Sequence, residues 1–158
     1  MSNRITPCLW FDTQAEEAVK FYTSIFKSSK IGAISHYGDG APMPKGTVLV
    51  VQFQLDGQDY MALNGGPLFK FTEAVSLVVN CDTQQEVDYY WEKLCAGGAP
   101  VQCGWLKDRY GLSWQIVPTI LGKLMQVDNP AGWGRVMQAM MQMVKLDIKA
   151  LEKAYAGS

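Results

Sequence analysis

Short apolar runs and two amphipathic stretches alternate along the chain, and their order occurs twice. Apolar runs at 5–11 and 74–79 predict β-strands. Each run is followed by a stretch with helical spacing of its apolar residues, over 13–26 and 83–96. The second stretch ends at Gly97-Gly98, a common helix terminator. The pattern therefore predicts two strand–helix units of similar size.

The same short motif opens both helical stretches. Phe11-Asp12-Thr13-Gln14-Ala15-Glu16 recurs as Cys81-Asp82-Thr83-Gln84-Gln85-Glu86. Both copies contain Thr-x-x-Glu, the capping box in which a threonine and a glutamate bind free amides at a helix start. We expect Thr13 and Thr83 to cap the two helices, and we interpret the repeat as a duplication of one structural unit.

Further strands complete each unit. In the first unit they are predicted at 30–37, 47–55 and 59–63. Asp56-Gly57 between the last two is a strong two-residue hairpin signal. The second unit offers only 101–107 and 112–117, so it is predicted to be one strand short or to have two strands merged. The fold class is α+β, with tandem βαβββ modules forming a concave mixed sheet whose inner face would receive a small ligand.

Beyond Pro118 the pattern is helical. A short helix is predicted over 119–127. A longer C-terminal helix is predicted from Asn129-Pro130, with its firm part from Arg135 because two glycines weaken its first turn. Its apolar stripe consists of Met137, Met141, Val144, Ile148, Leu151 and Tyr155. Such a methionine-rich stripe is typical of core cover, and it would also suit a dimer contact or a flexible lid.

Length and charge narrow the class of protein. The 158 residues fit one domain, with module one at about 1–68, module two at about 69–118 and a C-terminal helical extension at about 119–158. Fourteen basic and 15 acidic residues give a net charge of -1, which provides no electrostatic reason to expect nucleic acid or a membrane surface as a partner. No apolar run approaches the roughly 20 residues that span a bilayer. The first residues lack a signal peptide's apolar stretch, so we expect a cytoplasmic protein.

The cysteines and the single histidine offer little for catalysis. Cys8, Cys81, Cys95 and Cys103 contain no Cys-x-x-Cys pair, so small buried apolar residues are expected, with only weak support for disulfides or a zinc knuckle. A cysteine nucleophile needs an adjacent base. His36, the only histidine, lies on a predicted strand and is interpreted as a partly exposed strand residue.

Three segments resemble a known family. They are Ile5 to Asp12, Ala62 to Pro67 and the tryptophan-rich stretch Gly104 to Pro118. Together with the C-terminal stretch 135–140, they resemble the PhnB-like branch of the vicinal oxygen chelate superfamily, many of whose members are labelled 3-demethylubiquinone-9 3-methyltransferase. The resemblance implies paired βαβββ modules with the glyoxalase/bleomycin-resistance fold and, commonly, a homodimer.

The methyltransferase label is not supported by the glycines of this chain. An enzyme that uses S-adenosylmethionine would show a glycine-rich turn between a strand and a helix in a Rossmann-like layout. Gly65-Gly66 follows a predicted hairpin strand, and Gly97-Gly98 ends a predicted helix. We therefore do not expect methyltransferase activity.

The resemblance also implies positions for a divalent metal. Metal-dependent relatives resembling glyoxalase I hold the ion with four side chains, two from each module. The matching positions here fall at Ile5 or Pro7, at Ala62, near Glu73 and at Gln115. One carboxylate and one amide would hold a divalent ion only weakly. We expect no metal cofactor, and a weakly bound divalent metal is the alternative.

Each candidate pocket residue also has an ordinary structural interpretation. Gln115 either contacts a ligand or is a buried amide bonded to a neighbouring strand. Asn64 precedes Gly65-Gly66, where asparagine commonly shapes a turn. Glu73 is either a solvated carboxylate at a strand start or a general base. The tryptophans are core residues or platforms for a planar ligand: Trp10, Trp105 and Trp114.

Three functions remain open. The first is a metal-independent small-molecule-binding module, of a resistance or sequestration kind, with an apolar cleft. The second is an isomerase, lyase or dioxygenase with an altered ion site built from Glu73 and Gln115, with His36 as a third candidate ligand. The third is a structural dimer formed through the methionine stripe.

Overall fold

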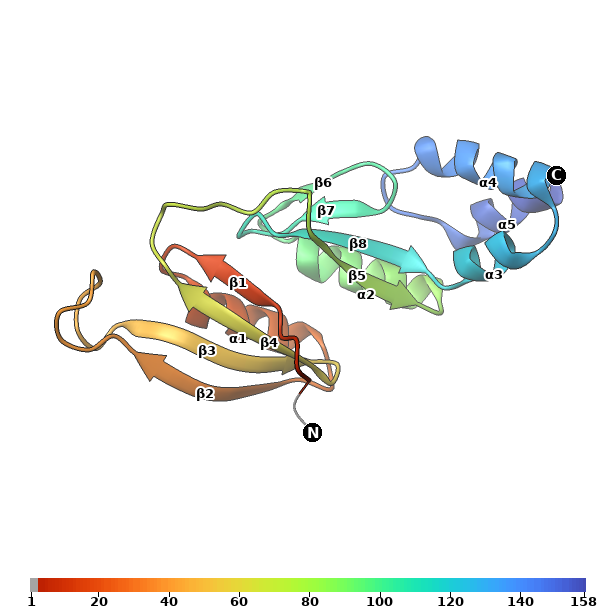
Figure 1. Ribbon diagram of the computed structural model, residues 1–158. Coiled ribbons are helices and arrows are strands. Elements are labelled where there is room, and N and C mark those ends of the chain that lie inside the picture. Colours follow the sequence, from red (N-terminus) through yellow and green to blue (C-terminus); the bar gives the residue numbers. More distant parts are fainter. Residues whose placement is uncertain (1–2) are drawn as a thin grey trace. The chain divides into compact units, whose positions relative to one another are not determined.

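The computed structural model describes residues 3–158, so the first two residues of the predicted first module lie outside the described residues. Two compact units make up the chain, one ending at Phe71 and the other comprising Thr72–Ser158. Each unit contains one four-stranded sheet with a helix packed on it, and the second unit also holds three C-terminal helices (Figure 1). No helix within residues 3–158 is long and apolar enough to cross a membrane.

The first unit is a βαβββ module. Its elements are β1 (Cys8–Phe11), α1 (Ala15–Ile25), β2 (Lys30–His36), β3 (Val48–Leu55) and β4 (Gln58–Asn64). The strand order is β1-β4-β3-β2, with β1 parallel to β4 and the other pairs antiparallel. The predicted hairpin is confirmed, because Asp56 and Gly57 both have positive φ, at 49° and 81°.

One face of the first sheet is buried against α1 and the other is open. Strand side chains alternate between faces, so buried Val51 and Ala62, which pair across β3 and β4, lie on the helix side. Their neighbours Gln52 and Met61, also paired, lie on the opposite side. Among residues 3–71, no helix covers that opposite side (Figure 1).

The two module helices begin in different ways. Thr83 caps α2 (Gln84–Cys95) as predicted, because its Oγ1 accepts a hydrogen bond from the Glu86 amide at 3.2 Å. The predicted cap of α1 by Thr13 is wrong: α1 starts after Gln14, and no side chain of its own N-terminus caps it. Instead, the Ala15 amide donates to Asn64 Oδ1 at 2.8 Å. A residue at the end of β4 thus replaces the local capping box.

The second unit repeats the strand order of the first. It contains β5 (Ser76–Cys81), β6 (Ala99–Pro100), β7 (Trp105–Lys107) and β8 (Ser113–Pro118), arranged as β5-β8-β7-β6 with α2 against one face. The identical order confirms the duplicated architecture. The prediction of a missing strand is wrong, because β6 is present. The sequence does not reveal β6, since a strand of two residues is too short to show alternation of apolar and polar side chains.

A buried carboxylate organises the turn between β7 and β8. Asp108 Oδ1 accepts hydrogen bonds from the amides of Tyr110 and Leu112, at 2.8 and 3.1 Å. Its Oδ2 accepts from the Trp114 indole Nε1 at 2.9 Å. Asp108 is buried, so these three donors compensate the cost of removing the carboxylate from water.

Two helices replace the single long C-terminal helix that the sequence predicts. After α3 (Ile120–Gln126) come α4 (Pro130–Met141) and α5 (Ile148–Ala156). Helix α4 begins at Pro130 as predicted, and its first turn is regular despite the two glycines, because Asn129 Oδ1 accepts from the Gly132 amide at 3.0 Å. A single apolar period spans both helices because both face one small core, which contains Leu121, Val136, Leu146 and Leu151.

The C-terminal extension is bonded to the second module through the main chain. The amides of Cys103 and Gly104 donate to the carbonyls of Met143 and Val144 at 2.9 and 2.7 Å. On α2, the Gln84 side chain accepts from the Ile148 amide at 2.8 Å and donates to the Leu146 carbonyl at 3.1 Å. The segment between α4 and α5 is therefore held by hydrogen bonds both to the loop before β7 and to the start of α2.

Strand β2 is an irregular edge of the first sheet. All seven of its residues are exposed, and its pairing with β3 shifts register twice, between Ile31 and Ile34 and between Ser35 and His36. Such bulges bend a strand and leave part of it unpaired.

Candidate functional site

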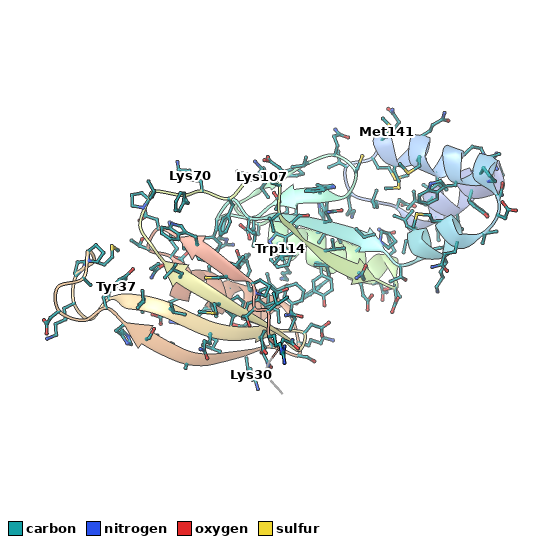
Figure 2. The ribbon with its side chains drawn as sticks, viewed as in Figure 1. Lys30, Tyr37, Lys70, Lys107, Trp114 and Met141 are labelled. Carbon is teal, nitrogen blue, oxygen red and sulfur yellow. The ribbon has the colours of Figure 1, made fainter. Side chains whose placement is uncertain are left out.

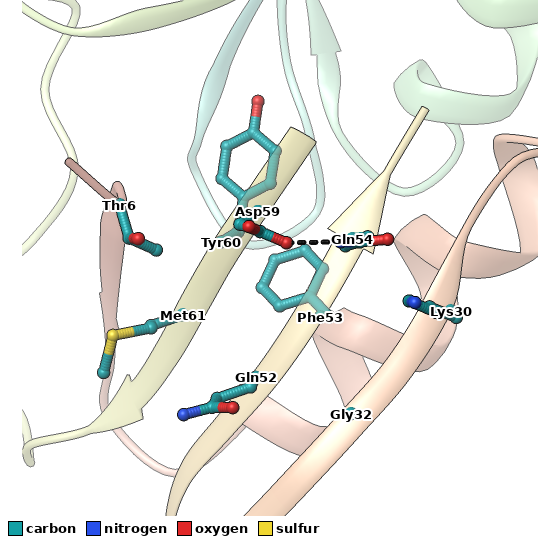
Figure 3. A pocket seen from close by; sticks show the side chains of 9 residues that line it. All are labelled: Thr6, Lys30, Gly32, Gln52, Phe53, Gln54, Asp59, Tyr60 and Met61. Carbon is teal, nitrogen blue, oxygen red and sulfur yellow. Dashed lines mark hydrogen bonds between the residues drawn. The ribbon is translucent and has the colours of Figure 1, made fainter. Parts of the chain in front are cut away.

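The first sheet carries a cavity of about 310 Å³ whose floor is the ends of β2, β3 and β4 (Figure 3). Its lining residues come from these strands and from the segment before β1: Thr6, Lys30, Gly32, Gln52, Phe53, Gln54, Asp59, Tyr60 and Met61. The register places Gln52 opposite Met61 and Gln54 opposite Asp59, so these four side chains share the open face. A volume near 310 Å³ lies at the small end of ligand pockets.

Polar groups of several kinds meet in this cavity. Gln54 Nε2 donates to Asp59 Oδ1 at 2.5 Å, which orients both side chains across the two strands (Figure 3). Lys30 stands opposite Gln54 on β2 and adds a positive charge. Met61 supplies an apolar surface beside Thr6. This arrangement can bind a small polar molecule through hydrogen bonds.

Tyr60 does not supply a general base to the cavity. Its ring stacks on Phe53 with centroids 5.4 Å apart. Burial raises the pKa of the Tyr60 phenol, so the phenol stays protonated at neutral pH. Its contribution to the cavity lining is therefore apolar surface.

Two predicted pocket residues of the first module have structural roles. Asn64 is buried, and its amide nitrogen donates to the Val48 carbonyl at 3.1 Å while its oxygen caps α1. It borders a second cavity, but both of its polar ends are occupied by main chain. The Trp10 indole donates to the Gly66 carbonyl at 2.9 Å, and a Cβ on Gly65 would lie 2.3 Å from its ring. Trp10 thus packs on the Gly65-Gly66 turn.

The matched metal positions of the first module have no side chain that could bind a metal ion. Ala62 has 0% exposure and lies on the α1 side of the sheet, whereas its neighbour Met61 lies on the open face. Pro7 offers only its carbonyl, which accepts from the Met61 amide at 2.9 Å. Ile5 is 84% exposed and apolar.

The open face of the second sheet brings together three of the predicted residues and two that the sequence did not indicate, Ser76 and Lys107. Gln115 lies opposite Trp105 on β7, and its Nε2 donates to Ser76 Oγ on β5 at 2.9 Å. Glu73 forms an ion pair with Lys107. The hydrogen bond from Lys107 lowers the pKa of Glu73, which therefore remains a carboxylate and is poorly suited to act as a general acid.

These residues do not fit a divalent metal. Glu73 is paired with an ammonium group, Gln115 is bonded to Ser76, and the first-module positions have no donor side chain. Within residues 3–158, no three histidine, cysteine, aspartate or glutamate side chains gather closely enough to hold an ion. A weak site at Glu73 and Gln115 would have to break both existing interactions.

The histidine and the cysteines are dispersed. His36 is exposed at the end of β2. Cys81 is buried as expected, and burial, followed by the nearby carboxylates, raises the pKa of its thiol to about 12. Cys8 is exposed, contrary to expectation, because it lies on the open face of β1 opposite Met61. None of the four thiols is in a disulfide.

Sequence reasoning missed the polar lining of the first cavity. Gln52 and Gln54 alternate with buried Val51, Phe53 and Leu55 on β3, which is the pattern of a strand with one open polar face. That signal could have pointed to this face. The contributions of Lys30 and Asp59 depend on strand register, which the sequence alone does not define.

Comparison with known proteins identifies the family of the chain. Residues 3–117 match the family model described as 3-demethylubiquinone-9 3-methyltransferase. A putative 3-demethylubiquinone-9 3-methyltransferase, the PhnB protein of Bacillus cereus, is 40% identical; the match covers 74% of this chain and 100% of that chain, with a TM-score of 0.68. No curated protein matches the chain.

More distant structures share the fold alone. A protein from Pseudomonas aeruginosa is 21% identical over 74% of this chain and 98% of its own, with a TM-score of 0.61. The fosfomycin resistance protein FosX of Listeria monocytogenes is 17% identical over 80% of this chain and 98% of its own, with a TM-score of 0.53. The architecture is that of the glyoxalase/bleomycin-resistance fold. The family model ends at residue 117, before α3, α4 and α5.

Proposed function

The chain belongs to the PhnB-like 3-demethylubiquinone-9 3-methyltransferase family of the vicinal oxygen chelate superfamily, and from that premise we propose that it binds a small polar molecule without a metal ion. The methyltransferase description is a family name only. Gly65-Gly66 follows β4 and Gly97-Gly98 follows α2, so neither is a strand-to-helix turn for a nucleotide cofactor.

The observation that carries the proposal is the cavity on the open face of the first sheet. It offers amide, hydroxyl, carboxylate and ammonium groups on a floor of paired strands, which is a rigid support for ligand binding. The four positions that hold a metal in related enzymes supply one paired carboxylate and one bonded amide. Hydrogen bonds are therefore the means by which this chain would orient its ligand.

A fragment screen tests the proposal. A library of small polar molecules would be examined by ligand-observed NMR with the full chain, in the presence and absence of EDTA. We expect binders whose affinity does not change with the chelator. The variant Gln52→Trp places a large ring in the cavity and is expected to weaken these binders about tenfold or more, as for a lost cluster of contacts.

Gln85→Trp is the matched control, because Gln85 is exposed on α2 and does not line the cavity. It should leave binding unchanged. Binding that requires an added divalent ion would contradict metal independence and favour the isomerase, lyase or dioxygenase hypothesis. Equal binding to wild type and Gln52→Trp would exclude the cavity as the site.

A homodimer is the second part of the proposal. Met141, labelled in Figure 2, is 64% exposed on α4. Met137, one turn earlier, is also exposed. Adjacent exposed methionines suit an adaptable protein contact. Sedimentation of the double variant Met137→Glu/Met141→Glu should show dissociation, whereas Gln138→Glu on the same helix should not. An unchanged assembly would exclude this stripe as the dimer interface. A cytoplasmic location and a cleft shared by the two modules stay predictions.

A further inference from the structure

We propose that the open face of the second sheet binds an oxyanionic group, such as a carboxylate or a phosphate, at Lys107 and Ser113. Ser76 and Gln115 supply further donors, and Glu73 is the carboxylate that the bound group replaces. This site goes beyond the cavity proposed on the first sheet, and neither depends on the other.

The first argument is the hydroxyl of Ser113. This side chain is 1% exposed, yet its Oγ has no hydrogen-bond partner among the described residues. Leaving a buried hydroxyl unbonded costs free energy, and buried polar groups are nearly always bonded. An oxyanion that accepts a hydrogen bond from Ser113 would provide the partner.

The second argument is the position of Lys107. Lys107 pairs with Ser113 across β7 and β8, and Ser113 pairs with Ser76 across β8 and β5. Paired residues project from the same face, so an ammonium and two hydroxyls form a row across three strands. Gln115 lies two residues further along β8 on the same face and adds an amide. Figure 2 labels Lys107 in this region of the second sheet.

The groups in this row are mainly hydrogen-bond donors. An ammonium carries three N–H groups and no acceptor, and each serine hydroxyl carries one O–H. Ser76 Oγ already accepts from Gln115, which leaves its own O–H to donate. Donors around one positive charge match the lone pairs of an oxyanion, and charge-assisted hydrogen bonds of this kind are the strong ones.

The third argument is the carboxylate already present. Glu73 precedes β5 and Lys107 lies on β7, so their ion pair joins the two sides of β8, the strand that carries Ser113. Both partners are substantially exposed, with 61% and 39% of their side-chain surface accessible. An exposed ion pair contributes little to stability and can be exchanged at low cost. Glu73 thus acts as an internal competitor that a ligand's oxyanion displaces.

Titration of the full chain with inorganic phosphate and with acetate, at constant ionic strength, tests the site by NMR shifts of the Gln115 side-chain amide. Lys107→Gln should weaken binding at least about tenfold. Glu73→Gln should tighten it about two- to fivefold, because the competing carboxylate is gone. Comparing the two anions distinguishes a phosphate site from a carboxylate site.

Ser113→Ala separates a binding role from a structural one. It should weaken anion binding about threefold while leaving the melting temperature unchanged or higher, because the hydroxyl has no partner to lose in the free protein. Lys93→Gln, at an exposed position on α2 outside both proposed sites, is the control and should not alter the Gln115 response.

Several results would overturn the proposal. Equal binding by wild type and Lys107→Gln, no gain with Glu73→Gln, or a lowered melting temperature in Ser113→Ala would each do so. An equal loss with Lys93→Gln would indicate nonspecific attraction and would also overturn it. None of these outcomes bears on fragments bound in the first-sheet cavity, so failure here leaves the proposed function standing.

Discussion

The two modules share one strand order, but they stabilise equivalent points by different means. Helix α1 is capped by Asn64 from a distant strand, whereas α2 is capped by its own Thr83 and Glu86. The β3–β4 connection is a two-residue turn, whereas the β7–β8 connection is built around the Asp108 carboxylate. Both modules therefore keep a hydrogen-bonded helix start and a closed turn. The residues that provide these bonds differ between the two modules.

Substitutions in the two turns should show the largest difference between the modules in the free energy of unfolding. Asp108→Ala leaves two amides and an indole without their buried acceptor, and we expect a loss of about 3–5 kcal/mol in the free energy of unfolding. Asp56→Ala changes only an exposed turn residue with φ of 49°, and the expected loss is about 1 kcal/mol. Urea unfolding of both variants measures the contrast. Similar losses would show that Asp108 does not organise its turn.

Substitutions at the two helix caps should differ less in the free energy of unfolding. Asn64→Ala removes the acceptor of the Ala15 amide and the donor to Val48 inside the protein, at an expected cost of about 2–3 kcal/mol. Thr83→Ala removes an exposed cap and should cost about 1 kcal/mol. Thr13→Ala, at the position equivalent to Thr83, serves as the control. A loss in Thr13→Ala as large as in Thr83→Ala would mean that the first capping box forms after all.

The smallest expected effects are on the pKa values of two exposed carboxylates, one in each module. Lys107 lowers the pKa of Glu73, and Lys20 lowers that of Glu16, each first through a side-chain hydrogen bond. A pKa that is lower in the folded state adds stability above the unfolded value, near 4.5, and this stability is lost as the pH falls through the folded value. Carboxyl NMR titrations should give both midpoints below 4.5.

Variants of the two lysines test whether each one lowers the pKa of its own partner carboxylate. Lys107→Gln should raise the pKa of Glu73 and leave that of Glu16 unchanged, and Lys20→Gln should do the reverse. If Glu73 titrated identically with and without Lys107, the ion pair would be absent in solution.

The sequence was sufficient where the determining interaction is local. Asp56-Gly57 defined a hairpin, and Thr83 with Glu86 defined a helix start, because both signals act within four residues. The cap of α1 was missed because its acceptor, Asn64, lies 49 residues away. The break after α4 was missed because Leu146 and Leu151 face the same core as Val136 and so continue its period.

The candidate site was predicted less completely for a related reason. In a strand, a shift of one residue exchanges the two faces, so a match at Ala62 does not say that Met61 is the residue on the open face. Gln115 and Glu73 were identified, but their partners Ser76 and Lys107 come from neighbouring strands, and only the register brings them together.

The irregular pairing of β2 has a consequence for the protein at high concentration. An outer strand with a regular row of free amides and carbonyls can recruit a strand from another molecule and start aggregation. In β2 the two register shifts interrupt that row, and Lys30 places a charge at its start. The strand is therefore a poor template for fibre growth, although Ile31 and Ile34 on it are exposed.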